Sequence, residues 1–185
     1  MIDKVIEHVI NDSVIISQMN SEYITLWKEN VFLTSRWWIT VALLILPWII
    51  WLTFRKREST HRLLYAGFWV YLISSILDAA GVAFGLWCYV VTPLPYLHSF
   101  FLPWDGSVLP VVVMLMIQIK PKLPSYLKAA IFALGSSFIA EPLAIWVKIY
   151  QPLTWRHYYG VPIYFVIYLL AHWMSKRKEF KRIQE

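Results

Sequence analysis

The chain has 185 residues, of which 59% are apolar and only 15% charged. Soluble domains average about 45–50% apolar and about 25% charged residues, so the composition excludes an ordinary water-soluble protein. The formal net charge of +6 does not require a nucleic-acid partner, because the basic residues are grouped around apolar segments.

The pattern predicts an all-α integral membrane protein, a bundle of about five transmembrane helices. Crossing a hydrocarbon core about 30 Å thick takes about 20 helical residues. The expected spans are 37–54, 63–88, 100–119, 125–149 and 159–175. These are continuous apolar runs without the alternation of barrel strands. The predicted localisation is the cell membrane, with several passes through the lipid bilayer.

Residues 1–35 are expected to form an extracytoplasmic amphipathic segment. Apolar side chains recur at helical spacing among charged ones, at Ile2, Val5, Ile6 and Val9. Two roles are open: an interfacial helix that orients the first span, and a lid over an outer pocket. No cleavable signal peptide is expected, because the first strong apolar run begins only at Trp37.

The basic residues predict an orientation. Of the 17 lysines and arginines, 12 lie on one side of the expected bundle, which the positive-inside rule makes cytoplasmic. They are Arg55, Lys56, Arg57, Arg62, Lys120, Lys122, Lys128, Lys176, Arg177, Lys178, Lys181 and Arg182. The N-terminus is then outside. Residues 36–180 form the transmembrane domain, and 176–185 form a basic cytoplasmic tail.

The second span carries a small and polar face, which favours the close approach of a neighbouring helix. Its members follow one another at three- and four-residue steps; they are Tyr71, Ser74, Asp78, Gly81 and Gly85. The connection that follows has two prolines and His98. It is expected to be an ordered outer loop.

Two further acids stand near prolines. Asp105 follows Trp104 in the first turn of the third span, where the helix dipole favours a carboxylate. Glu141 precedes Pro142 in the fourth span, and this proline predicts a local break in the helix. The aromatic and partly basic connection to the fifth span includes Trp155, Arg156 and Tyr159.

Asp78, Asp105 and Glu141 are the main functional candidates, because an ionisable group at membrane depth costs several kilocalories unless it is paired, hydrated or protonated. At 1.5 Å per residue, Asp78 lies roughly 22 Å and Glu141 roughly 25 Å from the inner ends of their helices. We therefore expect one outward-facing pocket in the outer half of the bundle. Its predicted ligand-binding residues are Asp78, Asp105, Glu141, Trp104, Trp155, Arg156, Tyr159 and His98. In the alternative, these acids only satisfy backbone groups or pair with Arg156, Lys148 and the serines.

The sequence predicts no metal site and no cofactor. The single cysteine, Cys88, excludes an internal disulfide. No helix carries two histidines or acids one turn apart, and there is no nucleophile elbow or glycine-rich phosphate loop. Asp78 and Glu141 are the candidates for catalysis, if any reaction takes place.

Several segments carry a family resemblance: Pro103-Trp104-Asp105, Phe138-Ile-Ala-Glu-Pro142, Trp155, and the run from Tyr158 to Tyr164. They resemble an uncharacterised family of small polytopic membrane proteins found in endospore-forming Gram-positive bacteria. The likeness covers residues 37–180. It implies a shared five-helix architecture in the cell membrane and brings no reaction with it.

Three functions are compatible with the sequence. The preferred one is binding or translocation of a small cation, an amine, a lipid-like ligand or protons. Five spans without an inverted repeat are few for an autonomous transporter, so a homo-oligomer or a larger membrane partner is then expected. The second is an intramembrane acid-catalysed enzyme, such as an isomerase or terpene-type cyclase. The third is a structural or accessory subunit of an envelope or spore membrane complex.

Overall fold

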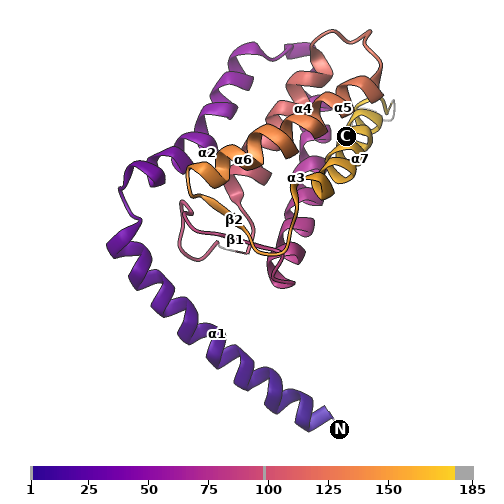
Figure 1. The fold of residues 1–185 in the computed structure, drawn as a ribbon. Helices are drawn as coiled ribbons and strands as arrows, with labels where there is room; N and C mark the ends of the chain where they lie inside the picture. The colour runs from indigo at the N-terminus through magenta and orange to yellow at the C-terminus, as the bar shows by residue number, and fades with distance from the viewer. Residues whose placement is uncertain (1, 98, 178–185) are drawn as a thin grey trace, which may run out of the picture.

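The structure is a computed structural model that describes residues 2–97 and 99–177. Figure 1 shows a body of packed helices from which the first helix, α1 (Ile2–Asn30), projects. This confirms the predicted N-terminal helix. Trp27 is its buried residue, and the indole Nε1 of Trp27 donates to the backbone oxygen of Thr92 at 2.9 Å. The body therefore holds α1 near its C-terminal end.

The body consists of helices in alternating directions, some of them built from two pieces. They are α2 (Ser35–Phe54), the short 3₁₀ turn η1 (Arg57–Ser59), α3 (Thr60–Ala83), the π-turn η2 (Trp104–Val108) with α4 (Leu109–Gln118), α5 (Ser125–Gly135) with the π-turn η3 (Ser136–Ala140) and α6 (Glu141–Trp146), and α7 (His157–Ser175).

Among the described residues, three helical stretches are long and apolar enough to cross a membrane: Ser35–Phe54, Arg57–Ala83 and Ser125–Trp146. Trp104–Gln118 is apolar but shorter. The many apolar side chains exposed on these helices, such as Ile49 of α2 and Leu134 of α5, suit contact with lipid. The protein is thus mostly helical and has the helices of a membrane protein. The count of five spans and the orientation stay predictions.

The second predicted span, 63–88, extends past the C-terminal end of the observed helix. Helix α3 stops at Ala83, and Gly85 follows with a φ of +65°. The backbone N–H of Leu86 donates to Gly81 O, and that of Gly85 donates to Val82 O. This is a Schellman motif, which satisfies the last helical carbonyls and favours glycine at the left-handed position.

The all-α prediction also missed a small sheet. Strand β1 (Trp87–Tyr89) pairs antiparallel with β2 (Tyr150–Pro152), and Cys88 lies opposite Gln151. The backbone oxygen of Leu86 also accepts hydrogen bonds from the backbone N–H groups of Leu153, Thr154 and Trp155. The two strands are far apart in the sequence and are not joined by a turn. They pair at the end of the bundle where α3 and α6 end and α2 and α7 begin, and for brevity we call this the hairpin end.

The core lies between α3, α4, α5 and α7. Its buried side chains are Ala66, Val70, Leu109, Val113, Ala129, Phe132, Ile167, Tyr168 and Ala171. A second cluster, formed by Val91, Phe101 and Ile149, lies under the sheet at the hairpin end. At the opposite end, Gln118 joins two basic loops, because its side chain accepts from Lys56 N and donates to Phe54 O. The site described next lies between the core and the cluster at the hairpin end.

Candidate functional site

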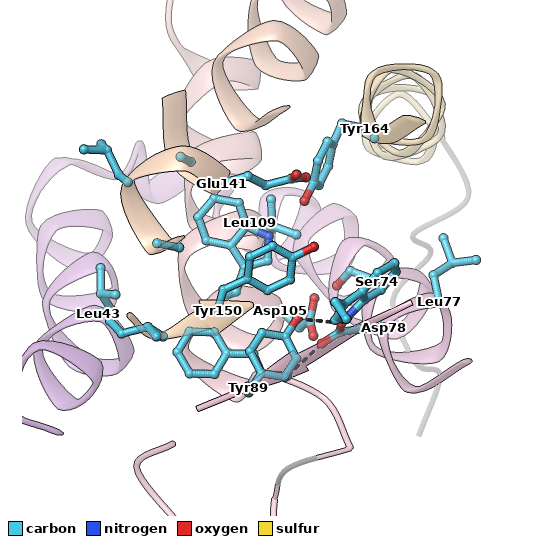
Figure 2. Close-up of a pocket in the computed structure, with 18 of the residues that line it drawn as sticks. Leu43, Ser74, Leu77, Asp78, Tyr89, Asp105, Leu109, Glu141, Tyr150 and Tyr164 are labelled. Atoms are coloured by element: carbon cyan, nitrogen blue, oxygen red, sulfur yellow. Dashed lines mark hydrogen bonds between the residues drawn. The ribbon is translucent and has the colours of Figure 1, made fainter. Parts of the chain in front are cut away.

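A cavity of about 390 Å³ opens between the helices near the hairpin end. Figure 2 shows its acids and tyrosines facing one another across an otherwise apolar space. All three acids predicted to form the pocket line it: Asp78, Asp105 and Glu141. Aromatic side chains make much of the wall, namely Trp87, Tyr89, Phe101, Trp104, Tyr150, Trp155 and Tyr164. Within the described chain, no lysine, arginine or histidine is among the lining residues.

Asp78 is held by three hydrogen bonds from the hairpin end. Its Oδ1 accepts from Trp87 Nε1 at 2.7 Å and from the Tyr89 hydroxyl at 2.6 Å. Its Oδ2 accepts from the backbone N–H of Phe101 at 2.7 Å. Short bonds of this kind to a carboxylate are stronger than neutral ones. Asp78 therefore fastens β1 and the segment that leads into η2 to α3. The bond from the Phe101 backbone is of the kind that the structural alternative expected, whereas the bonds from Trp87 and Tyr89 were not predicted.

The Tyr89 hydroxyl acts as a hydrogen-bond donor at this site. Burial raises the pKa of the Tyr89 hydroxyl well above its ordinary value, and the neighbouring carboxylate of Asp78 raises it further. Burial likewise raises the pKa of Tyr150, helped by the charges of Glu141 and Asp78. Both hydroxyls stay protonated at any physiological pH. Tyr89 therefore presents its hydrogen to Asp78, and neither tyrosine adds a negative charge to the site.

Asp105 is buried, with 2% of its surface exposed, and interacts with the side chains of Asp78 and Ser74. One of its oxygens, Oδ2, has no hydrogen-bond partner in the structure. An unpartnered carboxyl oxygen at such depth is costly. The Asp105 side chain lies beside Asp78 in the cavity wall (Figure 2), so two acids face this part of the cavity together.

Prolines explain where the helices change pitch. Leu109 N–H bonds to Trp104 O and Glu141 N–H bonds to Ser136 O, which are π-type steps. Pro110 and Pro142 follow directly, and each leaves a carbonyl four residues earlier without its helical donor. The indole of Trp48 donates to the freed Gly106 O at 3.1 Å. The break predicted beside Glu141 is thus present, and a matching one lies beside Asp105.

Glu141 pairs with His157 rather than with Arg156 or Lys148. Its Oε2 lies 3.1 Å from Nδ1 of His157, the first residue of α7. Its other oxygen faces Gly160: a Cβ placed there would lie 3.0 Å from Oε1 and 2.9 Å from Ser137 Oγ. Gly160 therefore leaves room for α7 to approach the two polar groups. Sequence reasoning missed this pair, because its members belong to different helical units.

Of the remaining predicted site residues, some line the cavity and others do not. Trp104 and Trp155 line the cavity. Arg156 and Tyr159 do not, which corrects the prediction: α7 begins at His157, and both side chains point outward at its start and are exposed. Tyr159 makes an edge contact with Trp155, at 5.4 Å between ring centroids. His98 lies outside the described residues. Helix α1 supplies no lining residue.

Gly81 offers a direct test of how the hairpin end is held. A Cβ added at Gly81 would lie 2.0 Å from the Trp87 ring, so the ring must leave Asp78. We expect Gly81→Ala to lower the free energy of unfolding by about 2 kcal/mol through overpacking. Thermal unfolding in detergent, followed by circular dichroism, measures this change.

The matched control is Gly135→Ala in α5, where an added Cβ meets nothing within 4 Å. Alanine is the better helix former, so this variant should unfold at the same temperature as the wild type or slightly higher. Equal melting of the two variants would show that the Trp87 contact does not hold the hairpin end.

Comparison with known proteins finds no matching family model, no matching curated protein and no matching solved structure. Function must therefore be argued from the site itself.

Proposed function

We propose that the protein is a multi-pass protein of the cell membrane whose pocket binds a small apolar molecule carrying a protonated amine. The observation that carries this proposal is the charge balance of the cavity: three carboxyl groups line it and no basic side chain among the described residues does. Two acids in contact at low dielectric repel each other unless a proton or a cation neutralises them. A cationic ligand supplies that neutralisation.

The aromatic wall supports the same ligand class. Ring faces attract ammonium groups, and aromatic cages recognise such cations in other proteins. Trp87 and Trp155 meet at 4.9 Å between ring centroids, and Tyr89 stacks on Phe101 at 4.9 Å. The rest of the wall is aliphatic, from residues such as Leu109 and Ile163. The site thus offers contacts for both ends of an amphiphile.

The polar groups divide into holding and receiving roles. Asp78 already accepts three hydrogen bonds and keeps the wall in place. Asp105 Oδ2 has no partner and receives the amine in this proposal. The carboxylate of Glu141 contributes negative charge from the opposite side of the cavity, and its pairing with His157 partly offsets this charge. The orientation that fits the basic loops puts this pocket on the outer side of the membrane.

Binding of decylamine and decanol to the purified protein tests the proposal. The two probes share an alkyl chain and differ in charge. We expect decylamine to bind at least about tenfold more tightly at pH 7, since one charge-assisted hydrogen bond is worth about 1.5–3 kcal/mol. Tryptophan fluorescence reports binding, because Trp87, Trp104 and Trp155 lie in the wall. Equal affinities, after correction for partition into detergent, would contradict recognition of the amine and would show that the site is only an apolar cavity.

An acid-catalysed isomerase or cyclase is the second candidate. The observation that favours it is again Asp105, whose unpartnered oxygen lies among aromatic rings. An acid so placed could protonate a double bond, while the rings stabilise the resulting carbocation. This reading predicts a neutral polyene in the pocket instead of an amine.

A further inference from the structure

The cavity is walled off toward the hairpin end. Trp87, Tyr89 and Tyr150 of the paired strands and Phe101 line it on this side. Three backbone amides, those of Leu153, Thr154 and Trp155, all donate to Leu86 O. Stacked rings and backbone bonds thus separate the cavity from the side where the loops meet water.

The sides of the cavity have a different chemistry. Ile39 and Leu43 line it from α2, and Leu143 and Ala144 line it from α6, with Val147 directly after the end of α6. Ile39 is 40% exposed and Leu143 is 53% exposed, so both also reach the outer surface. Every one of these side chains is a hydrocarbon. An opening with such a rim matches lipid chains and has nothing to offer water.

Helices α2 and α6 pack on different elements rather than chiefly on each other. Helix α2 packs chiefly on η2 and α4, while α6 packs on η3 and β2. Figure 1 shows α2 and α6 on the same side of the body. Since both line one cavity, they form its two edges on the surface that faces lipid.

We infer that the pocket is filled sideways from the bilayer, through the opening between α2 and α6, by a membrane amphiphile with a protonated amine. This inference rests on the proposed function and names the class of its ligand. The amine lies on Asp105 and the aromatic wall, and the chain leaves between Ile39 and Leu143 into the hydrocarbon layer. We do not expect the ligand to enter the pocket from water.

Depth and volume agree with such a ligand. Asp78 is five residues before the end of α3 and Glu141 five before the end of α6, which is about 7.5 Å along each helix. Amphiphile head groups lie at this boundary between head-group and acyl regions. A volume near 390 Å³ is at the lower end of ligand pockets, about 300–1,000 Å³. It accommodates a head and the start of a chain, so a long chain must extend outside.

Photolabelling in lipid nanodiscs tests the inference. The probe is octadecylamine with a diazirine in the middle of its chain, and excess unlabelled octadecylamine is the competitor. We expect competed labelling on the rim residues of α2 and α6, located by mass spectrometry of peptides. Leu143→Trp should reduce this labelling by about tenfold. Leu134→Trp, on the exposed face of α5 away from the cavity, should leave it unchanged.

The outcomes separate the two proposals. Competed labelling confined to the strands and loops of the hairpin end would show that an amine binds but arrives from water, and the lateral route would be wrong. Labelling that the competitor does not reduce anywhere would contradict both the lateral route and amine binding. Equal labelling of Leu143→Trp and Leu134→Trp would also contradict the route.

Discussion

Replacing Asp78 with asparagine is expected to lower the free energy of unfolding by about 3 kcal/mol. The carboxylate accepts bonds from Trp87, Tyr89 and the Phe101 amide, and an asparagine amide has only one oxygen. In either amide orientation the NH₂ group faces at least one donor, which is left buried and unpaired at a cost of about 1–3 kcal/mol. The bonds that survive also lose their ionic strengthening.

Thermal unfolding in detergent measures this loss. The control is Ser75→Ala on the same helix, because Ser75 Oγ makes no hydrogen bond in the structure. It should change the unfolding free energy by no more than about 0.5 kcal/mol. If Asp78→Asn melts together with Ser75→Ala, the carboxylate does not fasten the hairpin end. Reduced ligand binding by Asp78→Asn alone is not diagnostic, since the wall itself would have moved.

Replacing Asp105 with asparagine is expected to abolish the preference for the amine without unfolding the protein. An asparagine NH₂ can donate to the adjacent carboxylate of Asp78, so the fold is retained. The ionic contact to the ligand is lost, and affinity for decylamine should fall by about 30-fold, equivalent to about 2 kcal/mol. Affinity for decanol should change by less than about twofold, because the apolar wall is intact.

Titrations followed by tryptophan fluorescence on equally folded samples check this expectation. Ser107→Ala is a matched control, since Ser107 is buried in the same π-turn but is absent from the cavity wall. An Asp105→Asn variant that still prefers decylamine over decanol would place the receiving charge elsewhere. Glu141→Gln then becomes the next variant to measure.

The helices were predictable because their signal is local. Each apolar run is continuous, and the structure places helices over the same segments. The end of α3 was missed, although Gly85 at the end of the polar face is a common signal for a left-handed C-cap. The sheet had no such signal, because its two strands have three residues each and are far apart in sequence.

The acids of the site were also predictable, and their partners were not. A carboxylate inside an apolar run stands out by its cost, so Asp78, Asp105 and Glu141 could be named from the sequence. Whether Asp78 would bind Tyr89 or an arginine depends on how the chain folds back after α3. Charge alone favoured Arg156 over His157, but the first turn of α7 turns His157 toward Glu141 and leaves Arg156 exposed.

Mass spectrometry of small molecules and lipids retained by the detergent-purified protein tests the central claim most directly. Wild type and Asp105→Asn are compared in equally folded preparations. The account predicts a discrete amphiphilic amine that is retained by the wild type and reduced about 30-fold in the variant. A retained neutral isoprenoid, or identical lipid profiles in both samples, would contradict it.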